Sequence, residues 1–280
     1  MKNLKPYNAN DFEFYDSVLS AKDSDDLRLR LSPVSGVIKA AFDIYATHFR
    51  DNGLASLVPG PTFILHKRDL ISLYNYNSSA ISRLRNEIER LQPQQLRTTC
   101  QYCTLTSNES MDHYVPKDEF PEYAVNPLNL FPSCSKCNQH KSFVWRNNEK
   151  RTTLNLYTDQ LPDDQYLFVE VKLDEYSELE FEFYLENSGR IDDDVFSLIE
   201  SHFKSLKLLK RMREKSIPLI SELRNTICSR LKNLPYAVIK EEIRETAEAN
   251  RLDFGRNYWK SVVELELIEC PYFIRLLKIS

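Results

Sequence analysis

Two Cys-x-x-Cys pairs, Cys100/Cys103 and Cys134/Cys137, lie some thirty residues apart near the middle of this 280-residue chain. Two cysteines separated by two residues can turn both thiolates toward one ion, and two such pairs supply the four sulfurs of a closed tetrahedral zinc site. The segment between the pairs is too short to bury a sizeable core, so metal binding must supply stability that packing cannot. The spacing therefore predicts a structural zinc that folds this segment. The alternative is a set of reduced thiols in an intracellular core.

The segment between the two pairs also carries residues that could perform chemistry. Residues 111–117 are typical of a short strand that ends at a proline, and they include Asp112 and His113. A histidine in this place can accept a proton from water near neutral pH, so His113 is the candidate general base. Asp112 offers a carboxylate and Asn138 an amide oxygen, and such oxygen ligands favour Mg²⁺ or Mn²⁺. We therefore predict a second, catalytic metal site on Asp112 and Asn138.

Two further polar residues follow the last cysteine. If a helix begins near Cys137, Lys141 lies three residues beyond Asn138 on the same face. There it would lie near a bound phosphate, either to stabilise the transition state as a point charge or to position the backbone. His140 lies about 200° round the helix from Asn138. Asn138 is therefore the preferred ligand, and His140 remains an alternative one.

The order Cys-x-x-Cys, Asp-His, Asn-Leu and Cys-x-x-Cys-Asn-x-x-Lys over residues 98–151 closely resembles the HNH endonucleases, whose core is a ββα-metal finger. In that family the first His activates the attacking water, and the middle Asn holds that His in its orientation. The resemblance gives the first role to His113 and the second to Asn129, which would otherwise be assigned to a turn. It makes Asp112 and Asn138 the ligands of the catalytic metal. Asn in place of the last His is a common variant.

The resemblance implies an endonuclease that hydrolyses phosphodiester bonds of nucleic acid, with DNA favoured over RNA or tRNA. A narrower resemblance rests on Asp-His-Tyr-Val-Pro-Lys followed by Phe-Pro-Glu. This run is similar to HNH proteins of bacterial anti-phage systems, including those paired with an ABC-type ATPase in Septu-like and retron loci. It implies an effector nuclease that docks an ATPase partner. Two alternatives are lobes that clamp the substrate unaided and a non-catalytic zinc module that binds nucleic acid or a protein partner.

The net charge of −4 does not favour nucleic-acid binding, because phosphate affinity comes largely from Lys and Arg. The distribution of charge matters more than its sum, and two stretches are basic. The first lies beside the proposed site and contains Lys136, Lys141, Arg146, Lys150 and Arg151. The second has apolar residues at helical spacing, so a solvated helix face and a phosphate-binding face are both open; it contains Lys204, Lys207, Lys210, Arg211, Arg213 and Lys215.

Periodicity predicts an α+β chain with mainly helical N- and C-terminal lobes around the zinc-stapled core. Helices are expected over 37–49 and 70–91, a β-hairpin over 166–173 and 179–185, and further helices over 195–213, 218–231 and 236–249. We expect four parts: an N-terminal helical lobe (1–96), the ββα-metal core (97–152), a β-hairpin extension (153–192) and a C-terminal helical lobe (193–280).

Cellular location can also be predicted from the sequence. No apolar run is long enough to span a membrane, and the first residues lack the apolar core of a signal peptide. Cys228 and Cys270 stand singly in apolar surroundings, which is typical of buried thiols in a reducing compartment. We therefore expect a cytoplasmic protein with no membrane partner.

Overall fold

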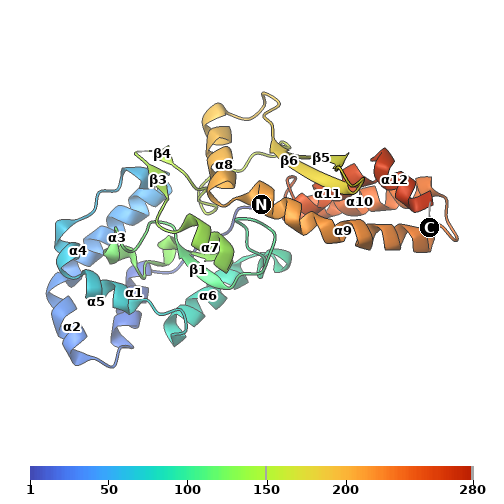
Figure 1. The fold of residues 1–280 in the computed structure, drawn as a ribbon. Helices are drawn as coiled ribbons and strands as arrows, with labels where there is room; N and C mark the ends of the chain where they lie inside the picture. Colours follow the sequence, from blue (N-terminus) through green and yellow to red (C-terminus); the bar gives the residue numbers. More distant parts are fainter. Residues whose placement is uncertain (149, 279–280) are drawn as a thin grey trace. The chain divides into compact units, whose positions relative to one another are not determined.

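The structure is a computed structural model that describes residues 1–148 and 150–278 (Figure 1). The chain divides into two compact units. The first consists of Asn3–Tyr102 and Thr106–Leu161. The second consists of Pro162–Ser280 together with Met1–Lys2 and Cys103–Leu105. The N-terminal helices therefore share a unit with most of the finger, and the hairpin shares one with the C-terminal helices.

Side-chain caps mark the start of some of the helices of the first unit. The side chain of Asn10 accepts hydrogen bonds from the N–H groups of Phe12 and Glu13 at the start of the first helix, and Ser78 caps the last one. The helix expected over 70–91 is two helices, because the Asn75 side chain accepts the Asn77 N–H in a turn between them. The helices are α1 (Asp11–Ser20), α2 (Asp25–Leu31), α3 (Ser35–Arg50), α4 (Pro61–Leu65), α5 (Lys67–Leu73) and α6 (Ser79–Leu91).

The finger follows as two strands and one helix. Strand β1 (Ser110–His113) pairs antiparallel with β2 (Leu130–Ser133), with His113 opposite Leu130. Helix α7 (Ser135–Lys141) begins after Cys134, whose sulfur accepts the N–H of Cys137 at 3.4 Å. Two short strands, β3 (Arg146–Asn147) and β4 (Lys150–Arg151), come next. The expected ββα order is therefore present.

Aromatic packing joins the finger to the N-terminal helices in one core. Tyr45 of α3 lies 4.7 Å from Tyr123 between ring centroids, and Phe120 meets Trp145 edge-on at 5.9 Å. All four residues are buried in the same apolar cluster. Their burial explains why the helical lobe and the finger fold as one unit.

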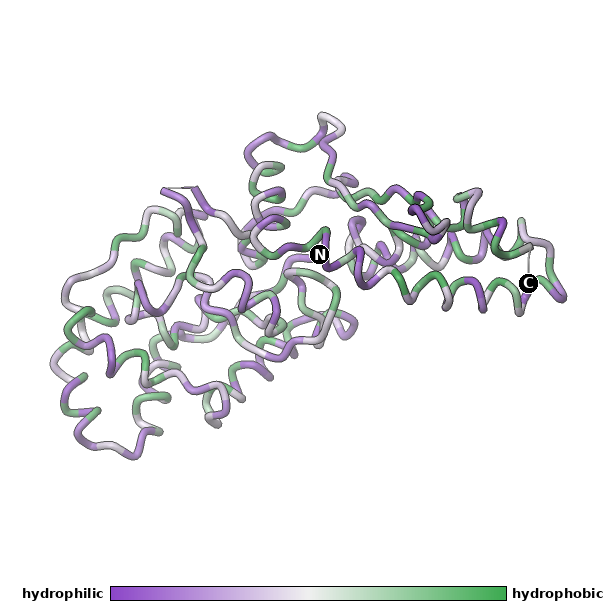
Figure 2. The backbone as a smooth tube through the Cα atoms, in the orientation of Figure 1, coloured by the Kyte–Doolittle hydropathy of each residue, from purple (hydrophilic) through white to green (hydrophobic). Residues whose placement is uncertain are grey.

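The second unit packs a β-hairpin against helices. Strands β5 (Leu167–Leu173) and β6 (Leu179–Leu185) pair antiparallel, which confirms the predicted hairpin. The predicted break near Pro218 is wrong: the chain turns at Lys207, where φ is +53°, and the next helix continues through the proline. Figure 2 shows polar and apolar residues alternating along that helix. The helices are α8 (Asp193–Ser205), α9 (Leu208–Arg230), α10 (Tyr236–Phe254), α11 (Trp259–Leu267) and α12 (Pro271–Lys278).

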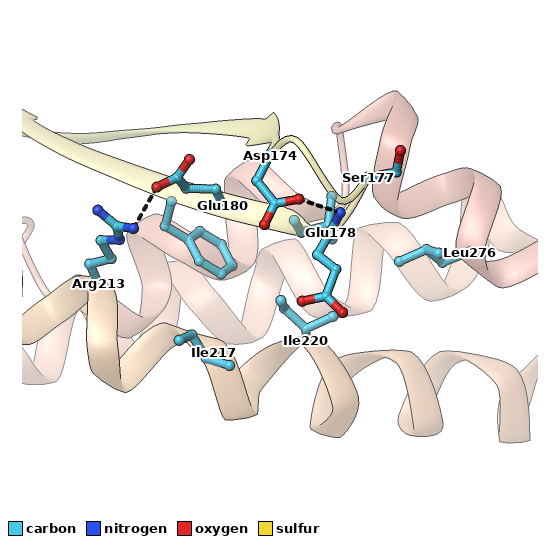
Figure 3. A pocket seen from close by; sticks show the side chains of 10 residues that line it. Asp174, Ser177, Glu178, Glu180, Arg213, Ile217, Ile220 and Leu276 are labelled. Carbon is cyan, nitrogen blue, oxygen red and sulfur yellow. Dashed lines mark hydrogen bonds and ion pairs between the residues drawn. The ribbon is translucent and has the colours of Figure 1, made fainter.

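A hollow of about 390 Å³ lies between the hairpin turn, α9 and α12 (Figure 3). Its apolar side chains include Ile217, Ile220 and Leu276, and Arg213 pairs with Glu180 at 2.5 Å along its edge. None of its described lining residues is a His or a Cys. The predicted site residues Asp112, His113 and Asn138 lie in the first unit. Among the described helices, none is long and apolar enough to cross a membrane.

Candidate active site

The four cysteines of the two pairs come together as one buried cluster. Their sulfur atoms all lie within 4.8 Å of one another. A tetrahedral zinc site with Zn–S bonds near 2.3 Å has sulfur atoms about 3.8 Å apart, which is compatible with this cluster. Four thiolates occupy all four tetrahedral positions, so they form the donor set of a structural site. The cluster could therefore bind zinc, as the spacing predicts.

His113 lies at the end of β1 with its imidazole held in one orientation. Its Nε2 lies 2.8 Å from the carbonyl oxygen of Ala124. A carbonyl oxygen only accepts hydrogen bonds, so Nε2 must carry the proton and Nδ1 is left as an acceptor. The ring of Tyr74 meets the imidazole edge-on at 4.5 Å between centroids. The neutral ring thus offers one basic nitrogen in a fixed direction.

Electrostatics keep His113 neutral. The pKa of His113 is lowered to about 3, mainly by burial and also by the ammonium groups of Lys117 and Lys141, while the hydrogen bond with Ala124 opposes this shift. At pH 7 the imidazole therefore carries no charge, which is the protonation state that a general base needs.

Asp112 is buried, with 2% of its surface exposed, and its carboxylate is held by two donors. The ammonium of Lys141 lies 3.0 Å from Oδ2 and 3.2 Å from Oδ1, and the Tyr102 hydroxyl donates to Oδ2 at 3.1 Å. Burial raises the pKa of Asp112, and the charge of Lys141 opposes that shift. Neighbouring side chains of an ideal strand point to opposite faces, yet Asp112 and His113 line the same cleft.

Lys141 is buried beside Asp112. Its ammonium is fully buried and also donates to the carbonyl oxygen of His113 at 2.7 Å. A buried ammonium must keep such partners, because removing it from water is costly. Lys141 therefore positions Asp112 and the end of β1. The expectation that it lies near a bound phosphate stays a prediction.

Asn129 is fully buried and uses its whole amide to hold the backbone. Its Oδ1 accepts the Val115 N–H at 2.7 Å and the Tyr45 hydroxyl at 3.1 Å. Its Nδ2 donates to the carbonyl oxygens of Val115 at 3.0 Å and Tyr123 at 3.1 Å. The expected contact with His113 is thus indirect: Asn129 fixes the loop that follows His113, and the Ala124 carbonyl orients the ring.

Asn138 lies on α7 beside β1. Its Nδ2 is 3.3 Å from the Ser110 hydroxyl and 3.4 Å from the carbonyl oxygen of Met111. These two acceptors fix the nitrogen side of the amide, so Oδ1 is the atom left for a cation.

One cleft of about 380 Å³ brings the predicted residues together. Asp112, His113 and Asn138 line it, whereas Asn129, Lys141 and His140 are not among its lining residues. A carboxylate and an amide oxygen beside a neutral histidine fit a hard divalent cation and a water molecule that loses a proton. The other lining residues come from the α5–α6 loop, β1, the loop after β1 and the end of α7, and they are Tyr74, Tyr76, Ser110, Met111, Pro116, Lys117, Asp118, Ser142 and Phe143.

The family follows from residues that span the finger. Residues 100–143 match the HNH endonuclease family. This segment is an HNH endonuclease domain. Over 189 residues the chain is 26% identical to protein ea31 of Escherichia phage lambda, a match that covers 63% of each protein. Over 47 residues it is 40% identical to Septu protein PtuB of Bacillus thuringiensis, which covers 15% of this chain and 18% of PtuB. No solved structure matches.

The basic stretch beside the HNH cleft has fewer unpaired positive charges than its sequence suggests. Lys141 pairs with Asp112, and its neighbours are engaged in the same way: Arg146 lies 2.6 Å from Glu119, and Arg151 lies 2.7 Å from Asp159. Lys136 and Lys150 are exposed. In the second stretch Arg211 is buried and donates to the Leu206 carbonyl, and Arg213 pairs with Glu180.

Three groups at the HNH site could not be assigned from the sequence. The Ala124 carbonyl is a backbone atom, and no residue type marks it. Tyr102 lies inside the first Cys-x-x-Cys pair, so its nearness to the site was the one available signal. Tyr74 reaches His113 from the α5–α6 loop, and only the fold brings it there.

Proposed function

We propose that the chain is a metal-dependent endonuclease that hydrolyses phosphodiester bonds of nucleic acid, with DNA favoured over RNA or tRNA. The observation that carries this proposal is the cleft in which Asp112, His113 and Asn138 meet within an HNH domain. The alternative is a non-catalytic zinc module that binds nucleic acid or a protein partner. Both functions need the four cysteines, but only the enzyme needs the three cleft residues.

The proton transfer follows from the tautomer of His113. Nδ1 takes a proton from the attacking water while Nε2 keeps its hydrogen bond to the Ala124 carbonyl. That carbonyl dipole also stabilises the imidazolium that forms, and a phosphate anion in the cleft favours it further. The water oxygen bonds to phosphorus, the bond between phosphorus and the 3′ oxygen breaks, and that oxygen takes a proton from solvent water. The products are a 3′-hydroxyl and a 5′-phosphate.

Oxygen ligands would hold the catalytic metal. Asp112 would contribute its carboxylate and Asn138 its Oδ1, and Mg²⁺ or Mn²⁺ suits this donor set. A cation bound there supplies positive charge that offsets the negative charge developing on the phosphate. Lys141 and Tyr102 keep the Asp112 carboxylate in place before the metal arrives.

The biological setting is the finer part of the proposal. The match to Septu protein PtuB supports an effector nuclease of a bacterial anti-phage system. We further propose that it works in the cytoplasm with an ABC-type ATPase partner, as the resemblance to Septu-like loci implies. The match covers 15% of this chain, so it supports the nuclease role more than the docking of a partner. The longer match is to a phage protein and supports no defence role.

Cleavage of plasmid DNA, single-stranded DNA and tRNA by the purified chain tests the enzyme, with Mg²⁺ or Mn²⁺ added or withheld. Asn138→Ala should lose at least about tenfold of the metal-dependent activity, because a ligand is removed. Gln139→Ala is the matched control, since Gln139 is the exposed neighbour on α7. Absence of cleavage in every reaction, also with a candidate ATPase added, would favour the binding module.

The zinc is tested separately from the catalysis. Cys134→Ser should lose the bound zinc and unfold the finger, because metal binding supplies much of its stability. Cys228→Ser is the control and should keep one zinc per chain by elemental analysis, since Cys228 lies outside the cluster. A stable Cys134→Ser protein without zinc would contradict the structural role.

A further inference from the structure

One aromatic side chain at the HNH cleft is exposed. Phe143 has 71% of its surface exposed, whereas the tyrosines that line the same cleft are half-buried. A single exposed apolar residue is ordinary on a protein surface. The position of Phe143 makes it a candidate for ligand contact, because it lines the cleft together with Asp112 and His113.

The turn after α7 carries Phe143. Ser142 has a positive φ of +49° with a ψ of −128°, and the N–H of Val144 donates to the Lys141 carbonyl at 3.0 Å. Residues other than glycine rarely adopt a positive φ, so the chain accepts strain at this turn. The turn follows the helix that carries Asn138, and Phe143 and Asn138 line the same cleft.

The other two rings of the cleft already have partners. The ammonium of Lys117 lies 4.8 Å from the ring centroid of Tyr74, and the guanidinium of Arg85 lies 4.7 Å from that of Tyr76. Tyr74 also contacts His113. Among the described aromatic side chains that line this cleft, Phe143 is therefore the most exposed one, and its ring is open to a ligand.

The charge of the protein limits how strongly phosphate contacts could hold a nucleic-acid strand. Three of the five basic residues near the site pair with internal acids, and the net charge is −4. Few phosphate contacts are then available, so the electrostatic part of the affinity is small. Stacking of a base on an aromatic side chain contributes about 1–3 kcal/mol without needing charge.

We propose that Phe143 stacks on an unpaired base, and that the HNH cleft takes single-stranded or locally unpaired nucleic acid. In a duplex both faces of an internal base are covered by its neighbours, so only an unpaired or flipped base can offer a face. This inference rests on the proposed nuclease function and names the class of substrate that the same site takes.

Binding of a single-stranded oligonucleotide that contains the fluorescent base 2-aminopurine tests the stacking. The zinc-loaded full chain carries His113→Ala to prevent cleavage, and Mg²⁺ is present. Stacking should quench the base, and Phe143→Ala added to this protein should remove the quenching and weaken binding roughly 5- to 150-fold. Phe143→Trp should keep both. Val144→Ala is the matched control, because Val144 is exposed beside Phe143 but does not line the cleft.

A fully paired duplex separates stacking from general affinity, and Phe143→Ala should change its binding less than about twofold. Equal losses for duplex and single strand, unchanged quenching in Phe143→Ala, or no binding by the parent protein would overturn the proposal. Cleavage by the wild-type chain is scored separately. Quenching without any cleavage would contradict the nuclease function and support the stacking. Cleavage of single strands at the same rate by wild type and Phe143→Ala would support the nuclease function and contradict the stacking.

Discussion

Two adjacent side chains at the end of β1 are buried in different electrostatic surroundings. His113 is held neutral by burial and by nearby ammonium groups, with Nε2 bound to the Ala124 carbonyl. Asp112 instead shares its burial with the charged Lys141 and with the Tyr102 hydroxyl. A base needs a free lone pair and a metal ligand needs a fixed oxygen, and these partners provide each residue with what its role requires.

Glu122 near the same loop is a buried acid whose pKa gives a test of this description. It is 3% exposed, and its Oε2 has no hydrogen-bond partner among the described residues. Burial raises the pKa of Glu122 to about 7. The folded state then binds this proton more tightly than the unfolded chain, where a Glu titrates near 4.3. Its contribution to stability is complete below about pH 4 and is lost as pH rises through 7.

Glu122→Gln removes this titration. It should raise the free energy of unfolding by roughly 1–3 kcal/mol at pH 8 and by much less at pH 5. Urea denaturation at the two pH values measures the difference, and Glu87→Gln is the exposed control. His113 acts in the opposite sense, since its pKa lies below the unfolded value and its contribution falls as pH drops from about 6.5 toward 3. A gain from Glu122→Gln that is equal at pH 5 and pH 8 would exclude the raised pKa.

At the scale of elements, the ββα finger holds its site through one helix and one strand. Lys141 at the end of α7 reaches across to Asp112 and to the backbone of His113 on β1. Asn138, one turn earlier on the helix, contacts Ser110 and Met111 of the same strand. The helix therefore fixes the strand end on which both site residues lie, and a change in α7 is expected to move the site as a whole.

Two lysines of α7 make a matched pair for testing this coupling. Lys141→Ala leaves the Asp112 carboxylate buried without its cation and should lower the free energy of unfolding by about 3–5 kcal/mol. Lys136→Ala removes an exposed lysine from the same helix and should change it by less than about 0.5 kcal/mol. Chemical denaturation of both variants gives the comparison. Similar small effects for the two lysines would mean that the buried ion pair does not hold the finger together.

At the scale of the whole molecule, local patterns predicted what is local. The cysteine spacing predicted the thiol cluster, and strand alternation predicted the hairpin of β5 and β6. Periodicity could not show the break between α5 and α6 or the continuation of α9 through Pro218. A single turn residue or proline is a weak local signal, and tertiary packing can override it.

Long-range pairings were beyond the reach of the sequence. The Leu4 N–H donates to the Leu156 carbonyl, and the Asn3 side chain donates to the same oxygen, so the start of the chain packs beside a segment some 150 residues later. Such contacts decide which segments share a compact unit. The pairing of charges was also out of reach. The sequence shows five basic residues near the site, but only the fold shows that three of them pair with acids.

The most direct test of the central claim is cleavage of a single-stranded oligonucleotide by wild type and His113→Ala, at equal zinc content and equal melting temperature. We expect His113→Ala to lose a factor of roughly 10² to 10⁴ in rate, since a general base typically contributes that much. Added imidazole should restore part of the rate, because the cleft that His113 lines can admit a small base. Cleavage by His113→Ala at the wild-type rate would contradict the proposed mechanism.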